Sequence, residues 1–351
     1  MGHLRPARAA QDRQCRRLFD YIAAQADQDV CWIGENVNGV QALPRHSWAA
    51  RLAIARAPVL IYSHGEDDFD ACLSLCRTLL GFTVYLGHGA NLVKRGAMHP
   101  DVLKHKSLLH RAASRFVVTD YDLLPCQSQL EKSFWDANRP TKASRHVVIN
   151  ASARLDAILD LTGQEPEQRI VWFPTFRDTA AARRQLTDTV QAVCAHPDLH
   201  RFLIEEGYML DIGLHVNHQE NFTEIAGLSS NISVFYADEL PHRLSRASLL
   251  VTDYSSVLID WLLFDRPAVF FPFDLNAYER VRGFHQPYES YVYGPRADTP
   301  DQLVAVLKAE LGFDSEAAQT QRAELRTRFL GAVEGGNAAT CYSAIRSRAA
   351  L

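Results

Sequence analysis

The feature that most constrains the fold is an alternation of short apolar runs with amphipathic segments. In the first half of the chain, runs rich in β-branched and aromatic residues occupy positions 30–34, 59–62, 82–86, 116–119 and 146–149. Helical patterns lie between some of them, at 69–80 and 102–113. Because the runs are continuously apolar, they predict strands buried on both faces, as in a parallel sheet. This order predicts a doubly wound α/β domain.

A second series of the same kind follows a polar stretch at 161–168, where Gly163 and Pro166 favour a linker. Its predicted strands occupy 169–173, 208–212, 232–235, 249–252 and 268–271. Its predicted helices occupy 180–195, 240–247, 256–264 and 302–311. We therefore expect an α/β chain with two doubly wound, Rossmann-like domains that face a central cleft at the carboxyl ends of their strands.

These segments divide the chain of 351 residues into four parts. We expect a basic helical segment at 1–28, an N-terminal Rossmann-like domain at 29–162, a C-terminal Rossmann-like domain at 163–335, and a terminal helix at 336–351. Two domains also agree with a typical size of roughly 150 residues each.

Composition excludes several classes of protein. The 37 Lys and Arg residues are outnumbered by 41 Asp and Glu, so no overall positive field would collect nucleic acid. Seven scattered cysteines contain no C-x-x-C pair, which argues against a disulfide framework. No apolar stretch reaches the ~18 residues of a membrane span. The first 20 residues lack the apolar core of a signal peptide, so we expect a cytoplasmic protein.

Two basic segments raise the question of a membrane surface. The first 28 residues carry arginines at 5, 8, 13, 16 and 17, and residues 104–111 alternate cations with leucines. Both segments could lie on anionic lipid headgroups at the inner face of the cell membrane. Both could equally be solvated outer faces of packed helices.

The strongest local signal lies at 249–260. A buried strand runs into Asp253, and Ser255 and Ser256 then open a predicted helix. Free N–H groups, the helix dipole and two hydroxyls would converge there, which suits a phosphate. Alternatively, Ser255 is an N-cap and Asp253 closes a turn. The spacing leaves both interpretations open.

The same region resembles the C-terminal signature of the CDP-glycerol glycerophosphotransferase family, which includes teichoic-acid primases and polymerases. The similarity rests on Thr-Asp-Tyr-Ser-Ser-Val at 252–257, the run at 265–271, Asp274, Tyr278 and 282–284. Three further segments agree in order: a His-Gly loop at 85–94, Pro-Thr-x-Arg within 173–177, and a histidine at a strand end, 214–215. The resemblance covers residues 80–295 and implies a fold of the GT-B type.

The resemblance also implies a reaction. Glycerol phosphate, or a related alditol phosphate, would pass from a CDP-linked donor to a hydroxyl of a cell-surface polymer or lipid-linked acceptor, and CMP would be released. The first domain would hold the acceptor, with Lys94 in contact with it, and the second the nucleotide donor. His88 and His215 would be the catalytic residues, with His88 as the base, because an imidazole with a pKa near ~6.5 suits that role.

The resemblance and the predicted strand ends also suggest which residues bind the donor. They are Arg177, Thr175, Asp253, Ser255, Ser256 and Asp274. Arg177 could hold phosphates with its bidentate fork. The alternative for Arg177 is a surface ion pair with Asp178 or another nearby acid.

The chain departs from the family pattern in two places. Residues 151–156 retain only Arg154 and Asp156 of a Gly-x-Pro-Arg-x-Asp segment, which makes the hinge geometry harder to infer. Residues 213–217 lack the Lys and Pro expected around His215. The donor and acceptor are therefore not fixed by the motifs alone.

No metal is expected in the reaction. The acidic run at 66–70 could ligate magnesium, but Asp67 and Asp68 precede a predicted helix and are expected to cap it. Helix N–H groups, Arg177 and His215 could neutralise the diphosphate without a cofactor. Two rival functions remain: a GT-B glycosyltransferase that uses a nucleotide sugar, although a Glu-x7-Glu donor motif is not evident, and a binding protein that has kept the fold.

Overall fold

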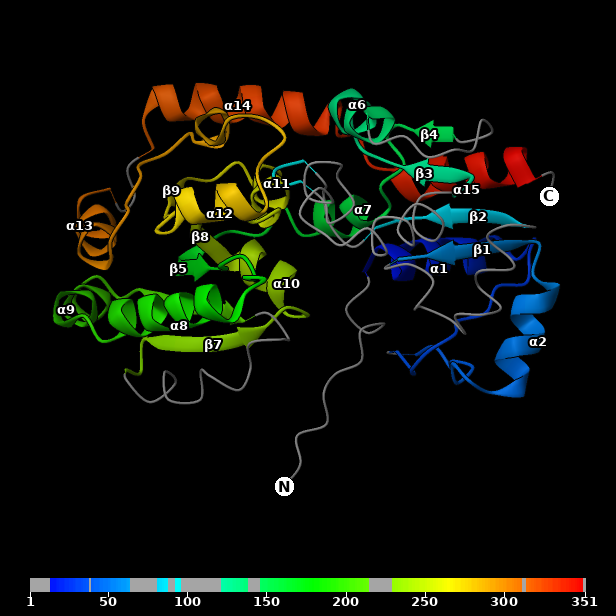
Figure 1. Cartoon of the computed structure of the whole chain (residues 1–351), viewed down its shortest axis with the longest axis horizontal. Coiled ribbons are helices and arrows are strands. Elements are labelled where there is room, and N and C mark those ends of the chain that lie inside the picture. Colours follow the sequence, from blue (N-terminus) through cyan, green and yellow to red (C-terminus); the bar gives the residue numbers. More distant parts are fainter. Residues whose placement is uncertain are drawn as a thin grey trace. The chain divides into compact units, whose positions relative to one another are not determined.

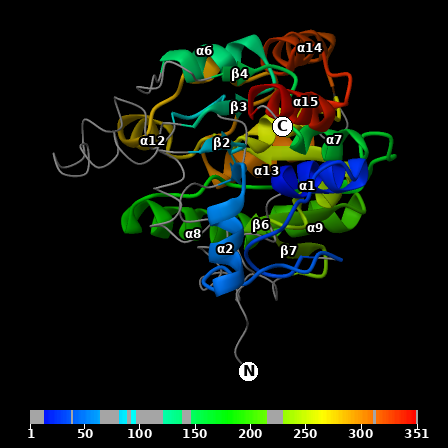
Figure 2. The ribbon, with the colours of Figure 1, turned by 90° about the vertical axis from the view of Figure 1, so that its right-hand side faces the viewer.

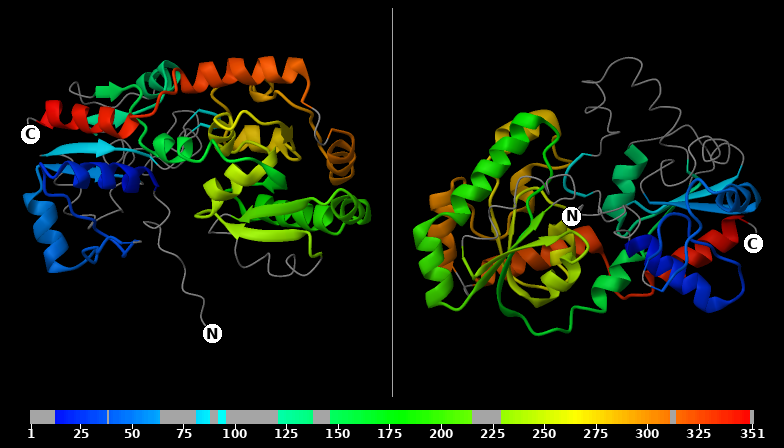
Figure 3. Two further views of the ribbon diagram at one scale, coloured as in Figure 1. Left: turned by 180° about the vertical axis from the view of Figure 1, so that it is seen from behind. Right: turned by 90° about the horizontal axis from the view of Figure 1, so that it is seen from below.

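The computed structural model describes residues 13–37, 39–63, 81–87, 92–95, 121–137, 146–214, 229–310 and 314–349. The chain forms two compact units (Figure 1), Met1–Asp160 with Arg328–Leu351, and Leu161–Thr327. The chain passes from the first unit to the second after Asp160 and returns near the end of α14 (Glu316–Leu330; Figure 3). The C-terminal helix, which we expected as a separate part, thus belongs to the first unit.

The first unit contains a parallel sheet of four strands in the order β1-β2-β3-β4. The strands are β1 (Val59–Tyr62), β2 (Phe82–Tyr85), β3 (Leu123–Pro125) and β4 (His146–Val148). Three of them coincide with predicted apolar runs. β3 was not predicted, because it has three residues and ends in a proline. The predicted strand at 116–119 and the predicted helices at 69–80 and 102–113 lie outside the described residues.

The strand predicted at 30–34 is wrong. Only Ile33 makes an isolated bridge, to Leu43. The apolar character of the run has another cause, because the indole of Trp32 packs edge to face against Phe19, with ring centroids 5.6 Å apart. The segment is therefore a loop held against a helix.

Five helices of the first unit are described: α1 (Arg13–Gln25), α2 (Trp48–Arg56), α6 (Gln129–Ala137), α7 (Arg154–Leu159) and α15 (Asn337–Ala349). Helices α1 and α15 lie side by side (Figure 2). Tyr342 of α15 packs against Tyr21 and donates its hydroxyl to Asp27. The first and last described helices therefore close the same core, to which Leu18, Ile22, Cys341 and Ile345 contribute.

Asp156 ties α7 to the start of α15. Its carboxylate accepts the backbone N–H groups of Asn337 at 3.0 Å and Ala338 at 2.8 Å, and the Asn337 side-chain amide at 2.8 Å. A carboxylate at a helix N-terminus satisfies N–H groups that have no partner within the helix. Asp156 is one of the two residues retained in the divergent segment 151–156, so its structural role is clear even though the segment has changed.

The second unit contains a parallel sheet of five strands in the order β7-β6-β5-β8-β9. The strands are β5 (Glu167–Trp172), β6 (Met209–Leu214), β7 (Ile232–Tyr236), β8 (Ala247–Thr252) and β9 (Ala268–Phe270). All five overlap the predicted runs. The chain begins at β5 in the middle, proceeds outward to β7, and returns to β8 on the other side of β5. The strand order therefore reverses between β5 and β8.

Helices bury both faces of this sheet (Figure 1). Ile170 and Trp172 of β5 share a core with residues of α8 (Ala180–Cys194), α9 (Pro197–Glu205) and α13 (Pro300–Glu310). Val171 between them is also buried, and α10 (Leu240–Arg246) and α11 (Val257–Trp261) contact β8. Burial on both faces explains why the strands are largely apolar.

Gly213 lets β6 pass between two aromatic rings. A Cβ atom at this position would overlap the ring of Phe173 and lie 2.6 Å from the ring of Phe235. Those rings are themselves in contact, with centroids 6.1 Å apart. A residue larger than glycine would therefore displace aromatic packing at the end of the strand that leads to His215.

Candidate active site

The predicted donor-binding residues follow the carboxyl ends of three strands. Thr175 and Arg177 follow β5, Ser255 and its neighbours follow β8, and Asp274 follows β9. Since β5 and β8 flank the point where the strand order reverses, these residues lie where open α/β sheets bind ligands. The second unit therefore places its candidate site at this edge.

Arg177 is the centre of a buried network at that edge. Its Nε and Nη2 donate to the two carboxylate oxygens of Asp274, at 2.8 and 2.7 Å. Nη2 also donates to Asp253 at 2.9 Å, and Nη1 donates to the Thr175 carbonyl at 2.6 Å. Asp253 in turn accepts the Thr175 N–H at 3.1 Å and hydroxyl at 2.7 Å. The loops after β5, β8 and β9 are thereby joined.

Aromatic rings enclose the guanidinium. Its carbon lies 5.1 Å from the ring centroids of Tyr254 and Phe273 and 5.2 Å from that of Tyr278. Tyr254 stacks on Tyr278, with centroids 4.2 Å apart, and donates its hydroxyl to Asp274 at 2.9 Å. Tyr288 donates its hydroxyl to the Asp253 carbonyl at 3.1 Å. The residues of the C-terminal signature thus converge on one cluster.

Sequence reasoning assigned no role to three members of this cluster: Tyr254, which lies within the signature at 252–257, Phe273 and Tyr288. A signal for two of them was present, because Tyr254 directly follows Asp253 and Phe273 directly precedes Asp274. An aromatic residue beside each buried carboxylate is an arrangement that can shield an ion pair from water. Tyr288 had no such marker.

Electrostatics keep the network charged. Burial alone would lower the pKa of Arg177, but the carboxylates of Asp253 and Asp274 outweigh it and raise that pKa above its ordinary value. Burial, reinforced by Asp253, raises the pKa of Tyr254, so its hydroxyl stays protonated. The guanidinium and Tyr254 therefore hold their protons at neutral pH, and neither is suited to accept a proton from a substrate.

The alternative of a surface ion pair for Arg177 is wrong. The side chain is 1% exposed, and Asp178 pairs instead with Arg282, at 3.2 Å. The guanidinium is bound to two carboxylates of its own chain. A direct contact between Arg177 and a donor phosphate stays a prediction, and the structure shows the residue organising the loops around it.

The two serines occupy different environments. Ser255 is buried, and its hydroxyl oxygen accepts the Val257 N–H at 3.4 Å. Asp253 closes the turn by accepting the Tyr254 N–H at 2.6 Å. Ser256 precedes α11 with helical φ and ψ of −63° and −11° and makes no capping hydrogen bond. Of the six predicted donor-binding residues, all described, Ser256 alone is half-buried and the others are buried.

The two predicted catalytic histidines, His88 and His215, lie outside the described residues. β6 ends at Leu214, directly before His215. Gly87, directly before His88, has a φ of 72°, a left-handed conformation in which glycine is favoured. Lys94, the predicted acceptor contact, is half-buried and follows the buried Leu92 and Val93.

Other signature residues stabilise the second unit. Arg266 is buried and donates to the carbonyls of Ser245 at 2.8 Å, Ala247 at 2.6 Å and Gln164 at 2.6 Å. Asp265, with a φ of 53°, accepts a hydrogen bond from Arg322 at 2.7 Å. This part of the signature therefore holds in place the end of α10 and the polar stretch at 161–168, which contains Gln164.

A metal site is not evident within the part of the chain that the structure describes. No group of three or more His, Cys, Asp or Glu side chains there is placed to hold an ion. The acidic run at 66–70 and the two catalytic candidates lie outside that part. Metal independence therefore stays an expectation.

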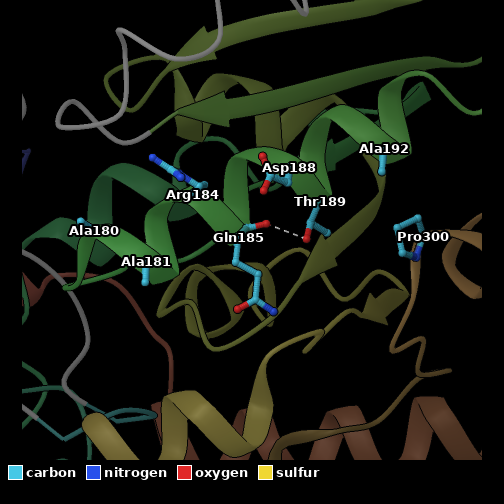
Figure 4. A pocket seen from close by; sticks show the side chains of 8 residues that line it. All are labelled: Ala180, Ala181, Arg184, Gln185, Asp188, Thr189, Ala192 and Pro300. Carbon is cyan, nitrogen blue, oxygen red and sulfur yellow. Dashed lines mark hydrogen bonds between the residues drawn. The ribbon is translucent and has the colours of Figure 1, made fainter.

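A surface hollow of about 620 Å³ lies along α8 (Figure 4). Its lining residues are Ala180, Ala181, Arg184, Gln185, Asp188, Thr189, Ala192 and Pro300. Small alanine side chains explain the hollow. None of the predicted site residues lines it, so it is separate from the edge cluster, the buried network of Arg177, Asp253 and Asp274 with its surrounding rings.

Comparison with protein families decides the relationship. The sequence model of the CDP-glycerol:poly(glycerophosphate) glycerophosphotransferase family matches residues 8–347. The chain belongs to this family. The match spans the described elements of both units and confirms the resemblance inferred from the motifs.

Curated relatives match over shorter stretches. The teichoic acid glycerol-phosphate primase of Bacillus subtilis is 28% identical over 156 residues, 44% of this chain and 39% of the relative. The teichoic acid poly(ribitol-phosphate) polymerase of Bacillus spizizenii is 38% identical over 72 residues, 20% of this chain and 12% of the relative. The matched segments thus span well under half the length of these relatives.

Solved structures support the fold. The wall teichoic acid polymerase TagF matches with a TM-score of 0.73 at 17% identity, over 96% of this chain and 85% of that chain. A UDP-N-acetylglucosamine 2-epimerase candidate from Listeria monocytogenes matches with a TM-score of 0.59 at 12% identity, over 96% and 93% of the two chains. With two Rossmann-like parallel sheets, the chain has a fold of the GT-B type, as expected.

Proposed function

We propose that this protein transfers glycerol phosphate, or a related alditol phosphate, from a CDP-linked donor to a hydroxyl of a cell-surface polymer or lipid-linked acceptor. The observation that carries the proposal is the family match over residues 8–347, which includes both units. The matched relatives, a glycerol-phosphate primase and a poly(ribitol-phosphate) polymerase, agree with it. The acceptor hydroxyl attacks the phosphorus that bears the alditol, the bond to the bridging oxygen breaks, and CMP leaves.

The reaction has two requirements that the predicted residues meet. A base must take the hydroxyl proton, and His88 is the candidate for that role. Donor groups must stabilise the charge on the diphosphate, and His215 with the turn at Ser255 and Ser256 are the candidates. Metal ions are not required in this scheme.

The edge cluster supports the donor site by positioning it. Arg177, Asp253 and Asp274 bind one another, so their part is to hold the loops after β5, β8 and β9 in one arrangement. Ser256, half-buried and with its hydroxyl unpaired among the described residues, is the side chain we expect to contact the donor. Thr175 and Ser255 shape the same turn.

A membrane surface is the proposed place of action, on the cytoplasmic side. On α2, Trp48 is 83% exposed and Leu52 is 50% exposed. Arg51 stacks on Trp48 at 5.5 Å, and α2 contains no acidic residue. Exposed tryptophan and leucine beside arginines suit an anionic lipid interface. No helix among the described residues is long and apolar enough to cross a membrane.

The N-terminal arginines offer less support for membrane contact than the sequence suggested. Arg16 pairs with Asp20 at 2.8 Å, and Arg17 pairs with Asp160 at 2.9 Å. Arg5, Arg8 and the basic segment 104–111 lie outside the described residues.

The exposed side chains of α2 provide the test of membrane contact. Sedimentation with anionic vesicles should weaken in Trp48→Ala with Leu52→Ala. Ile204→Ala, which removes a side chain that is 64% exposed in the second unit, should bind as the wild type does.

The decisive experiment measures CMP release. Purified protein is incubated with CDP-glycerol or CDP-ribitol and a polymer or lipid-linked acceptor, with and without EDTA. We expect release from a CDP-alditol that survives EDTA and is lost in His88→Ala. The matched control is His242→Ala, since His242 is exposed in the second unit.

Other outcomes would refute the proposal. Transfer of a sugar from UDP-glucose without turnover of CDP-alditols would establish the glycosyltransferase. Undiminished CMP release in His88→Ala would remove that residue as the base. Binding of CDP-glycerol without turnover on any acceptor would favour a binding protein.

A further inference from the structure

The first unit contains an apolar cavity that none of the predicted site residues lines. It has a volume of about 520 Å³, within the range of ~300–1,000 Å³ typical of small-molecule sites. Side chains of α1, α2, β1, α15 and the loop at 28–33 line it. Among them are Leu18, Phe19, Ile22, Ile54, Leu60 and Ile345. The wall is thus largely hydrocarbon.

Trp32 supplies a buried polar group to this wall. The residue is 8% exposed, and its indole Nε1 has no hydrogen-bond partner among the residues that the structure describes. A buried N–H donor without a partner is costly, and native proteins seldom leave one. A ligand that carries an acceptor oxygen could satisfy it. This observation points to an amphiphile, because a pure hydrocarbon could not accept the bond.

The charged residues of the cavity favour an anion. Arg45 and Arg56 line it, and neither guanidinium group has a hydrogen bond or ion pair to the residues that the structure describes. Asp29 is the one carboxylate among the lining residues, so the cations outnumber it. Unpaired guanidinium groups beside an apolar wall match an anionic head group attached to a hydrocarbon chain.

The outer side of α2 supports a lipid as the source of that chain. The same helix that contributes Ile54 and Arg56 to the cavity exposes Trp48 and Leu52 on its outside (α2 is blue in Figure 1). A lipid that leaves a membrane beside these side chains would meet the cavity on the same helix. Tryptophan is enriched at membrane–water interfaces.

We infer that the cavity binds the hydrocarbon chain of an anionic lipid, with Arg45 and Arg56 holding the head group and Trp32 Nε1 donating to one of its oxygens. The chain could belong to an acyl lipid or to a polyisoprenyl phosphate, which share this chemistry. The inference does not rest on alditol phosphate transfer, and its test contains no CDP-alditol.

The test titrates the full chain with dodecyl phosphate, farnesyl phosphate and dodecanol, each below the concentration at which it forms micelles, and follows binding by calorimetry. We expect saturable binding of one amphiphile per chain. Ala53→Leu, which fills the cavity, should lower the affinity for the two phosphates about tenfold or more. Arg45→Gln with Arg56→Gln should lower it about tenfold for the phosphates and leave dodecanol unchanged.

The controls separate the cavity from other surfaces. Ala181→Leu changes an alanine of the hollow on α8 and should bind as the wild type does. The double arginine variant alters partly or fully exposed side chains, so it tests the inference even if Ala53→Leu does not fold. A preference for dodecyl phosphate identifies an acyl lipid, and one for farnesyl phosphate an isoprenoid. Absence of saturable binding, or binding unchanged in both variants, would overturn the inference.

Discussion

Arg177 and Asp274, 97 residues apart in the sequence, form a two-bond fork in which Nε and Nη2 of the guanidinium each donate to one carboxylate oxygen, at 2.8 and 2.7 Å. Both side chains are almost completely buried, at 1% and 2% exposed. The pair fixes the loop after β5 to the loop after β9. Asp253 joins the same guanidinium from β8, so the candidate donor edge depends on one cation.

Removing that cation should destabilise the second unit. In Arg177→Met the carboxylates of Asp253 and Asp274 would stay buried without a counter-charge, and such losses cost about 3–5 kcal/mol. The measurement is the free energy of unfolding in urea. Arg201→Met, which breaks the exposed pair with Asp198, is the control and should cost about 0–1 kcal/mol. Equal losses in the two variants would contradict a special role for the buried network.

Asp156→Ala should loosen α15. The carboxylate accepts three N–H groups of Asn337 and Ala338, and loss of a helix cap costs about 0.5–2 kcal/mol. Hydrogen exchange should accelerate in the first turn of α15, and thermal unfolding should shift downward. Asp160→Ala, which removes an exposed partner of Arg17, is the matched control. Unchanged exchange in α15 would show that the cap is dispensable.

Gly213→Ala should disturb the end of β6. The added methyl group would overlap Phe173 and approach Phe235, and overpacking of this kind costs about 1–3 kcal/mol. Gly163→Ala is a suitable comparison, because a Cβ there meets nothing within 4 Å. Since β6 leads directly to His215, we expect CMP release to fall in Gly213→Ala and not in Gly163→Ala. Equal CMP release in the two variants would show that the packing at the end of β6 does not affect catalysis.

The aromatic cluster should make the protein sensitive to alkali. Burial raises the pKa values of Tyr254, Tyr278 and Tyr288. In the unfolded chain tyrosines lose their protons near pH ~10, whereas in the folded chain these three retain them. Their contribution to stability is therefore complete below that pH and is lost as the pH rises further.

Tyr278→Phe tests this alkaline prediction. Its hydroxyl makes no hydrogen bond to the described residues, so the variant should be close to the wild type at pH 7. Above pH ~10 its free energy of unfolding should fall less steeply, by up to about 1.4 kcal/mol per pH unit. If the free energies of unfolding of the variant and the wild type fell equally with pH above ~10, folding would not raise the pKa of Tyr278.

The sequence predicted the second unit well because burial on both sheet faces leaves an unmistakable pattern. The runs at β5 to β9 are largely apolar, although β6 contains the buried Asp211, and each overlaps its predicted strand. The first unit was harder. The run at 30–34 is apolar because Trp32 packs on α1, and apolarity alone does not distinguish a strand from a packed loop. β3 escaped notice because its two leucines are followed at once by Pro125, and proline is disfavoured within a strand.

The candidate site was predictable as a set of positions but not as a set of contacts. The motifs named Arg177, Asp253 and Asp274, and the structure brings the three side chains into contact. The contacts of Arg177 were not predicted, because sequence does not reveal that two carboxylates and three rings surround it. Tyr288 was unforeseeable for the same reason, since its contact with Asp253 spans 35 residues.

The placement of α15 in the first unit has a consequence for synthesis on the ribosome. The residues of the second unit, Leu161–Thr327, form one uninterrupted stretch, whereas the first unit needs Arg328–Leu351 to complete its core. Cys341, Tyr342 and Ile345 emerge only after the whole second unit has been translated. The nascent N-terminal half therefore stays incompletely folded, with part of its interior exposed, until then. We expect chaperones to bind it during that interval.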